Sequence, residues 1–372
     1  MIEKKAKTSN RIFYYDAIRA FAILAVIIYH ISNTVDFLLL KNAFSTTSNT
    51  LIYYFINNFF KTGVNLFLML SGALLLGRKY ESIKSFLTKR LPRITLPFIF
   101  WGLTISILLI GIVYLFPNKL TTLSVYNLDI VTTLSLKNIL NFIFDSFLAK
   151  PRWFKPFWFF WLILGLYLIL PLINKLILNS NLEEIEYYLV IWILSCFIFN
   201  TLKISFPLHL EYFSGYLGLT ILGYYLVNSP RKFINSIYCS IIFIMIFGLL
   251  SILIAYYTHA FNPYGDLNIL IIFLSTGIFL FFKNFNQLNI HWGFIKNPES
   301  TLRKFISDLS KYSYGIYLMH RFIIFILFIL FIPILGYKRL TLILFIGTVI
   351  ICFAIMNLLD KIPIINRLIG SK

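Results

Sequence analysis

The sequence predicts an all-α integral membrane protein, a polytopic helical bundle of about ten transmembrane helices that forms one domain over residues 1–372. Hydrophobic residues make up 59% of the chain and charged residues only 13%, about half of the roughly 25% usual in soluble domains. A soluble fold could not bury so much apolar surface, so lipid must surround much of the chain. Apolar runs such as residues 241–257 lack the alternation of outer-membrane strands, which favours helices.

Five apolar stretches in the N-terminal half are expected to cross the membrane. A bilayer core about 30 Å thick needs roughly 20 apolar residues per helix. The first stretch, 12–32, follows a basic N-terminus, but it carries ionisable residues and no small-residue cleavage site, which predicts a retained helix and not a signal peptide. The stretches 55–77 and 94–116 flank a basic connection, and 157–174 begins with aromatic residues. The fifth stretch, 187–202, is short for a span.

Five further stretches, at 210–228, 233–256, 267–282, 313–335 and 340–359, complete the predicted bundle. With a cytoplasmic N-terminus, the inside segments hold 21 Lys and Arg residues and the outside loops hold 9. Because cytoplasmic segments of membrane proteins are enriched in basic residues, this bias predicts a cell-membrane protein with both termini in the cytoplasm. The chain ends soon after the tenth stretch, so no appended soluble domain is expected.

The charge and cysteine content exclude two classes of function. A net charge of +19 would suggest nucleic-acid binding in a soluble protein. In a membrane protein, basic residues fix the topology and meet anionic lipid headgroups, so we expect membrane lipids and no nucleic acid as partners. The cysteines are isolated, without a CxxC or zinc-ligand spacing, which predicts small core residues and no metal site: Cys196, Cys239 and Cys352.

The first predicted helix carries a stripe of polar residues that lipid would disfavour. Arg19 and His30 are eleven residues apart, which places them on one helix face about 16 Å apart along the axis. Asp16 lies three residues before Arg19 and can pair with it. Arginine alone could extend to the interface, and a histidine could bond a neighbouring helix. The shared face favours a functional site in which His30 is a general base, because imidazole accepts protons near neutral pH.

A pair of arginines stands at the predicted cytoplasmic start of the third span. Arg90 and Arg93 are three residues apart and share a helix face, and Pro92 would fit a first helical turn. Two cations at a helix start oppose the helix dipole. The positive-inside bias is one explanation. The other is an anionic ligand, such as a phosphate-bearing cofactor, held by the arginines and the free N–H groups.

Aromatic residues are concentrated at the start of the fourth predicted span. Trp158, Trp161 and Tyr167 lie in the stretch 151–173, which is rich in Trp and Phe. Such residues form an aromatic belt at the membrane interface. They could also make a wall against which a sugar stacks, and the sequence leaves both interpretations open.

Two further polar positions, one in the second span and one late in the chain, are candidates. Ser71 precedes Gly72, and small residues of this kind permit close contact between helices. No G-x-S-x-G elbow surrounds Ser71, which argues against a hydrolase nucleophile. His320 lies within a predicted span beside Arg321 and is either a second active-site group or a packing histidine.

Together these segments resemble the acyltransferase-3 family of membrane proteins, which includes membrane O-acetyltransferases that act on bacterial envelope glycans. The resemblance extends over nearly the whole chain. It is carried by five segments in the family's order: an R-x10-H signature at Arg19 and His30 preceded by Asp16, an R-x-x-R signature at Arg90 and Arg93, 67-FLMLSG-72, an aromatic segment with Trp158, Phe159, Tyr167, Leu168 and Pro171, and 313-SYGIYLMH-320.

The resemblance implies transfer of an acyl group, commonly acetyl, from cytoplasmic acyl-CoA to a hydroxyl of an extracytoplasmic or lipid-linked envelope glycan. Acetyl-CoA is then the donor, no metal is involved, and a homo-oligomer stays open. His30 would deprotonate the acceptor, while Arg19, held by Asp16, would orient the donor or stabilise negative charge. Arg90 and Arg93 would bind the CoA phosphates. The expected substrate-binding residues are Trp158, Trp161, Tyr167, His320 and Ser71.

Two other functions fit a bundle of this kind. A non-enzymatic transporter or flippase of a lipid-linked sugar would also contain buried charges and outer aromatic residues. The two arginine signatures favour the enzyme. A glycan polymerase would be expected to have a large basic outer loop, and the segment 117–156 is only modest in size.

Overall fold

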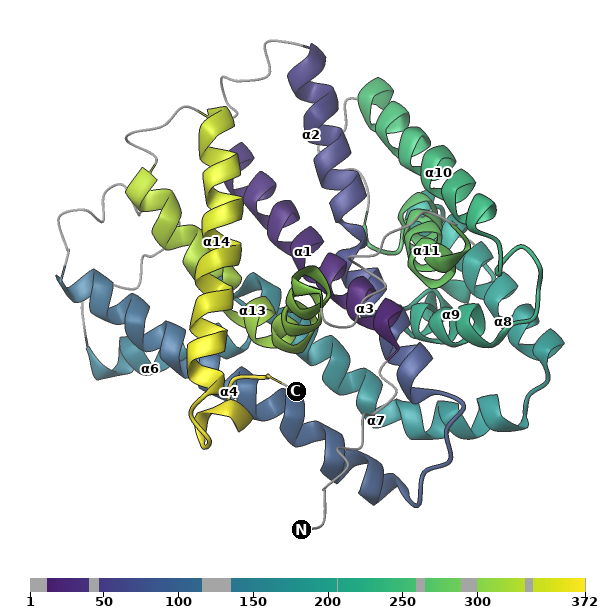
Figure 1. Ribbon diagram of the computed structural model, residues 1–372, viewed down its shortest axis with the longest axis horizontal. Coiled ribbons are helices and arrows are strands. Elements are labelled where there is room, and N and C mark those ends of the chain that lie inside the picture. The colour runs from purple at the N-terminus through teal and green to yellow at the C-terminus, as the bar shows by residue number, and fades with distance from the viewer. Residues whose placement is uncertain are drawn as a thin grey trace.

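The computed structural model describes residues 12–39, 47–115, 135–205, 207–258, 265–288, 300–331 and 337–371. These residues form helices and short connections, without a strand among them. Within this described part, eight helical segments are long and apolar enough to cross a membrane. The predicted all-α multi-pass bundle is therefore confirmed (Figure 1).

The long apolar segments correspond to eight of the ten predicted spans. They are α1 (Phe13–Leu39), α2 (Thr47–Phe60) joined to α3 (Thr62–Leu75), α4 (Ile83–Leu115), α7 (Trp158–Asn179) with the 3-10 turn Arg152–Phe157 before it, α10 (Ile237–Thr258), α11 (Ile269–Asn284), α13 (Thr301–Phe331) and α14 (Tyr337–Asp360).

The other two predicted spans correspond to shorter helices. Helix α8 (Leu182–Ser195) continues into a π-helical segment (Cys196–Thr201), and α9 (Leu217–Asn228) follows a 3-10 turn (Leu210–Phe213). A further helix, α6 (Leu136–Phe147), precedes α7 and was not predicted.

Helix α1 lies inside the bundle and contacts α2, α3, α11, α13 and α14. In Figure 1 it passes between α13 and α14 on one side and α2 and α3 on the other. Helices α10 and α14 expose most of their apolar residues at the periphery, as lipid-facing helices do. The polar stripe of α1 therefore lies in the protein interior, where ionisable side chains can have partners.

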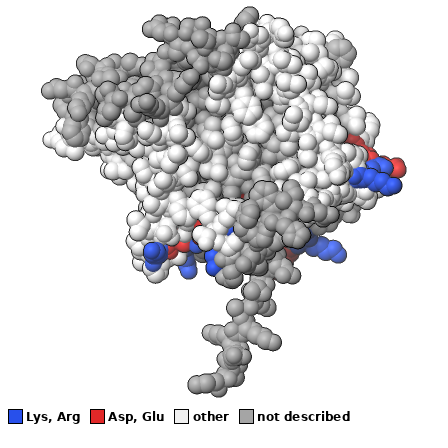
Figure 2. Space-filling model, turned by 45° about the horizontal axis from the view of Figure 1, so that its top comes forward, with Lys and Arg blue, Asp and Glu red and all other residues white. Residues whose placement is uncertain are grey.

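The outer surface of the described chain is largely apolar. Ile107 is 62% exposed and Met245 is 66% exposed, as expected for side chains that face lipid. Figure 2 shows a broad surface without charged side chains, with Lys, Arg, Asp and Glu gathered near its lower edge and at one side. This distribution matches a hydrocarbon-facing surface with charged margins.

Two helices begin well before the predicted spans. Helix α4 begins at Ile83, so Pro92 lies inside the helix, and the expectation of a first-turn proline and a free helix start at the arginines is wrong. Helix α13 likewise begins at Thr301, twelve residues before the predicted span. Hydropathy locates the membrane-embedded part of a helix, whereas helical backbone can continue into polar sequence outside the membrane.

The second predicted span is broken at Lys61, between α2 and α3. This residue is only 8% exposed and lines a cavity. Its ammonium group lies 5.5 Å from the centre of the Tyr29 ring, a cation–π contact with α1.

Helices α3 and α9 cross at very close range because glycines lie at the contact. A Cβ atom on Gly72 would stand 1.6 Å from the carbonyl oxygen of Thr220, and one on Gly223 would stand 1.9 Å from the carbonyl oxygen of Met69. Each helix thus presents a glycine to the backbone of the other. The predicted role of the small residues in helix contact is confirmed at Gly72.

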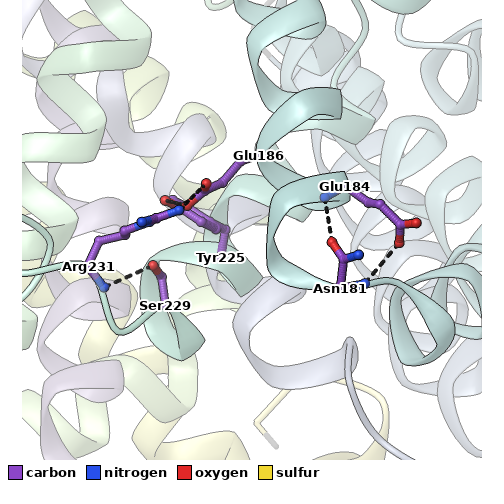
Figure 3. Close-up of polar contacts among 6 residues, drawn as sticks. All are labelled: Asn181, Glu184, Glu186, Tyr225, Ser229 and Arg231. Carbon is purple, nitrogen blue, oxygen red and sulfur yellow. Dashed lines mark hydrogen bonds and ion pairs between the residues drawn. The ribbon is translucent and has the colours of Figure 1, made fainter.

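A cluster of ion-pair and hydrogen-bond contacts connects α8 to the segment after α9 (Figure 3). Arg231 donates two hydrogen bonds to the Glu186 carboxylate, at 2.8 and 2.7 Å, and Tyr225 donates a third at 2.7 Å. The first turn of α8 is closed by a capping box between Asn181 and Glu184. These contacts fix the short helix α8 against α9.

The Glu186 contacts predict a pH-dependent stability. Hydrogen bonds from Arg231 and Tyr225 lower the pKa of Glu186 to about 2, against about 4.3 for an unperturbed glutamate. The stabilisation is present above the unfolded-state pKa and disappears as the pH falls toward about 2. We expect Glu186→Gln to lower Tm near neutral pH, and the difference from wild type to close between about pH 4.3 and 2, measured by thermal unfolding in detergent. Glu183→Gln, at an exposed position in the same turn, should not show this pH dependence.

Candidate functional site

A cavity of about 590 Å³ lies between α1, α3, α4, α7 and α13. It holds most of the charged candidates, and we call it the basic pocket. Its volume lies within the range of small-molecule sites. The residues that line it include Arg19, Ser71, Arg90, Arg93, Tyr167, Ser310, Lys311, Tyr314 and Tyr317.

Arg90 is held in this pocket by aromatic rings. Its guanidinium lies 4.7 Å from the centre of the Phe86 ring and 5.5 Å from that of Tyr80. Its Nε atom is buried and has no hydrogen-bond partner among the described residues. A buried N–H group without a partner is costly, so this position favours an anionic ligand.

Arg19 is fixed by a carboxylate and a hydroxyl. Its Nη1 atom lies 3.7 Å from the Asp16 carboxylate and donates to the Ser310 hydroxyl at 3.1 Å. That hydroxyl donates in turn to Asp16 at 2.8 Å. The pairing of Asp16 with Arg19 expected from their spacing is therefore present, with Ser310 of α13 as a bridge that the sequence spacing could not indicate.

A second cavity of about 390 Å³ lies around the C-terminal half of α1, and we call it the distal pocket. Tyr317 lines both pockets, which makes it a shared wall. Its hydroxyl donates to the carbonyl of Pro156 at 2.8 Å, and its ring packs against Phe159. The distal pocket is lined by Val26, Tyr29, His30, Phe60, Lys61, Val64, Trp158, Tyr216, Gly265, Asp266 and Tyr317.

His30 contacts a buried arginine that the sequence did not assign to the site. Arg321 Nη1 lies 3.0 Å from His30 Nδ1. Because arginine only donates hydrogen bonds, Nδ1 is the acceptor and neutral His30 carries its proton on Nε2. Arg321 is 6% exposed, and its guanidinium lies 5.6 Å from the centre of the Trp153 ring. The arginine thus sets the tautomer of His30.

His320 lies close to His30 but outside both pockets. The two ring centres are 5.2 Å apart, and His320 is fully buried. Its Nδ1 lies 2.7 Å from the carbonyl of Tyr317, so the neutral ring carries its proton on Nδ1. Its Nε2 is buried without a hydrogen-bond partner among the described residues.

The remaining candidates divide between the pockets and the surface. Ser71 and Tyr167 line the basic pocket, and Ser71 donates to the carbonyl of Phe67 at 3.0 Å. Trp158 lines the distal pocket. Trp161 is 45% exposed, donates to the carbonyl of Phe147 at 2.8 Å and lines neither of these pockets.

Sequence reasoning missed three kinds of site residue. Tyr317 belongs to the late SYGIYLMH segment, where its position within the motif was the available signal. Ser310 precedes that segment as one of several serines. Tyr216 was placed within the predicted span 210–228, and the structure has it in the connection before α9; Asp266 lies in the connection before α11, and hydropathy carries no signal for a site at either position. The described residues contain no group of three His, Cys, Asp or Glu side chains that could hold a metal ion.

Comparison with known proteins gives one match. A family model of the acyltransferase-3 type, described as an acyltransferase domain, matches residues 12–357 and so covers nearly the whole chain. It spans every residue named above as lining the distal pocket and all three arginines of the basic pocket. No curated protein and no solved structure matches the chain.

Proposed function

The chain belongs to the acyltransferase-3 family, and on this premise we propose that it transfers an acetyl group from cytoplasmic acetyl-CoA to a hydroxyl of an extracytoplasmic or lipid-linked envelope glycan. The family assignment makes it a membrane acyltransferase. The donor, the acceptor and the catalytic roles are the proposed part. We place the enzyme in the cell membrane with both termini in the cytoplasm, as the distribution of basic residues indicates.

The basic pocket is the proposed donor site. Arg19, Arg90 and Arg93 line one cavity, and the buried Nε of Arg90 is directed at no protein partner among the described residues. This is the observation that carries the proposal, because clustered arginines are suited to phosphate groups. CoA is a phosphate-bearing donor found in the cytoplasm. Ser71 and Tyr167 would contact the donor in the same cavity.

His30 is the proposed general base and lines the distal pocket, which shares Tyr317 with the basic pocket. The acceptor oxygen forms a bond to the acyl carbonyl carbon, the thioester C–S bond breaks, and the proton of the hydroxyl passes through His30 to the departing CoA sulfur. In neutral His30 the lone pair is on Nδ1, where Arg321 donates. His30 can therefore act as a base only after Arg321 has withdrawn from Nδ1.

Arg19 and Asp16 support the donor in this scheme. Asp16 is 2% exposed and Arg19 lines the basic pocket, so the carboxylate is placed to position the guanidinium and not to contact the donor itself. A fixed cation beside the thioester would orient it or stabilise the negative charge that develops on the carbonyl oxygen. On the acceptor side, Trp158 would stack against a sugar ring in the distal pocket.

Removal of one arginine tests the donor site. Arg90→Ala should raise KM for acetyl-CoA about tenfold or more, because a hydrogen bond to a charged group contributes about 1.5–3 kcal/mol. The assay follows radiolabel from acetyl-CoA into envelope glycan in membranes. Lys84→Ala is the matched control, since it removes a cation from the exposed part of the same helix. An unchanged KM in Arg90→Ala would contradict this donor site, and membranes that neither bind nor consume acetyl-CoA would favour transport instead.

A further inference from the structure

Several polar residues of the distal pocket have no role in the scheme above, among them Lys61, Tyr216 and Asp266. Asp266 is held on two sides. Its backbone carbonyl accepts a hydrogen bond from Asn65 of α3 at 2.8 Å, and its Oδ2 accepts one from Tyr216 at 3.2 Å. Asn65 is fully buried, so the backbone at Asp266 is anchored to the core of the bundle.

Several positive groups lie around Asp266. Four helices begin at the distal pocket: α3 just after Lys61, α7 at Trp158, α9 just after Tyr216 and α11 three residues after Asp266. Helix N-termini carry a partial positive charge. Burial raises the pKa of the Asp266 carboxyl, while Lys61 and Tyr216 act in the opposite direction. Burial is the larger influence on this pKa, and the neighbouring groups offset it only in part.

Among the charged residues and His30, the distal pocket offers more hydrogen-bond donors than acceptors. Lys61 is a donor, and His30 presents Nε2–H while Arg321 occupies its Nδ1. Asp266 is the one acidic side chain among the lining residues of this pocket. A substrate hydroxyl that enters the pocket thus finds its charged hydrogen-bond acceptor at Asp266.

Charge and shape indicate the class of molecule that would fit. One cation and one anion line the pocket, so its own side chains carry no net charge, and a further unpaired charge would be costly to bury. The rings of Trp158 and Tyr216 lie 5.8 Å apart and form a continuous aromatic wall. Aromatic faces and a hydroxyl-binding carboxylate together suit an uncharged sugar.

We propose that the distal pocket binds an uncharged, polyhydroxylated acceptor, and that Asp266 accepts a hydrogen bond from a hydroxyl neighbouring the one that is acylated. This inference rests on the proposed acyl transfer and refines its acceptor. Asp266 is a substrate-binding residue in this view, and Tyr216 positions it.

The test uses the full-length protein in membrane vesicles with radiolabelled acetyl-CoA and two soluble acceptors. Methyl β-D-glucopyranoside is the neutral probe, and methyl β-D-glucuronoside carries an added carboxylate. Asp266→Asn keeps the shape of the side chain and removes its charge. We expect KM for the neutral probe to rise about tenfold or more, as for loss of a charge-assisted hydrogen bond, with KM for acetyl-CoA unchanged. Glu211→Gln, at a carboxylate outside the pocket, should leave both KM values unchanged.

The remaining outcomes separate this inference from the proposed function. An unchanged KM in Asp266→Asn, or acetylation of the glucuronoside alone, would overturn the inference. So would a wild type that binds acetyl-CoA but acetylates neither probe, and that result would leave the donor site intact. A wild type that does not bind acetyl-CoA would instead refute the proposed function. If Asp266→Asn does not fold, Tyr216→Phe removes the hydrogen bond that positions Asp266 and is expected to raise the same KM by a smaller factor; no rise would count against the inference.

Discussion

Replacement of His30 by alanine is expected to reduce acyl transfer by about two to four orders of magnitude, the range that general acid–base catalysis contributes. His30 lines the distal pocket, and Tyr317 lines both this pocket and the basic pocket. The variant should still bind acetyl-CoA, because the three arginines of the basic pocket are unaffected. Transfer of radiolabel to envelope glycan, together with acetyl-CoA binding at equal expression, measures both effects.

A control variant at a second histidine shows whether the loss of activity is specific to His30. His209→Ala removes an exposed imidazole that contacts Glu211 at 3.0 Å and lies away from both pockets. It should retain wild-type transfer. Activity of His30→Ala within a few-fold of wild type would exclude His30 as the base, and a parallel loss of acetyl-CoA binding would indicate a structural effect instead.

The second large effect is expected from Gly72→Ala, which should prevent stable assembly of the bundle. The added methyl group would lie 1.6 Å from a backbone carbonyl of α9, and no side-chain rotation can relieve that clash. Overpacking of a well-packed core costs about 1–3 kcal/mol and more where the backbone must move. We expect a marked loss of monodisperse protein after detergent extraction and a lower Tm, measured by size-exclusion chromatography and thermal unfolding.

Gly165 provides the control for that prediction. It lies within α7, and a Cβ there would meet nothing within 4 Å. Gly165→Ala should therefore leave the yield unchanged or raise Tm slightly, because alanine favours a helix by up to about 1 kcal/mol over glycine. Equal behaviour of the two alanine variants would show that α3 and α9 can separate without loss of the fold.

The helical architecture could be predicted because its signal is local. A run of apolar residues specifies a span wherever it lies, and the spacing of Asp16, Arg19 and His30 follows from the helical repeat. The residues at which helices begin and end were harder to predict from the sequence. Arg90 lies seven residues into α4, because polar residues such as Lys84 continue a helix as readily as apolar ones do.

The composition of the pockets could not be predicted because it depends on contacts between distant segments. Ser310 reaches Arg19 across 291 positions, and Arg321 reaches His30 across the same interval. Asp266 meets Tyr216 only when α9 and α11 begin side by side at the distal pocket. Periodicity describes one helix at a time and contains no information about which faces of two helices meet.

The position of Tyr317 between the two cavities affects whether protons could leak across the membrane through the protein. Arg19 in one cavity and His30 in the other are about 16 Å apart along α1, which is roughly half of a hydrocarbon layer about 30 Å thick. Continuous water through both cavities would conduct protons down the electrochemical gradient, worth about 2.3 kcal/mol per charge for each 100 mV. Tyr317 lines both cavities and is held by a hydrogen bond to the carbonyl of Pro156, so its ring is positioned to interrupt such a column of water. Such an arrangement would allow the proposed acyl transfer to take place within the bilayer while the membrane stays energised.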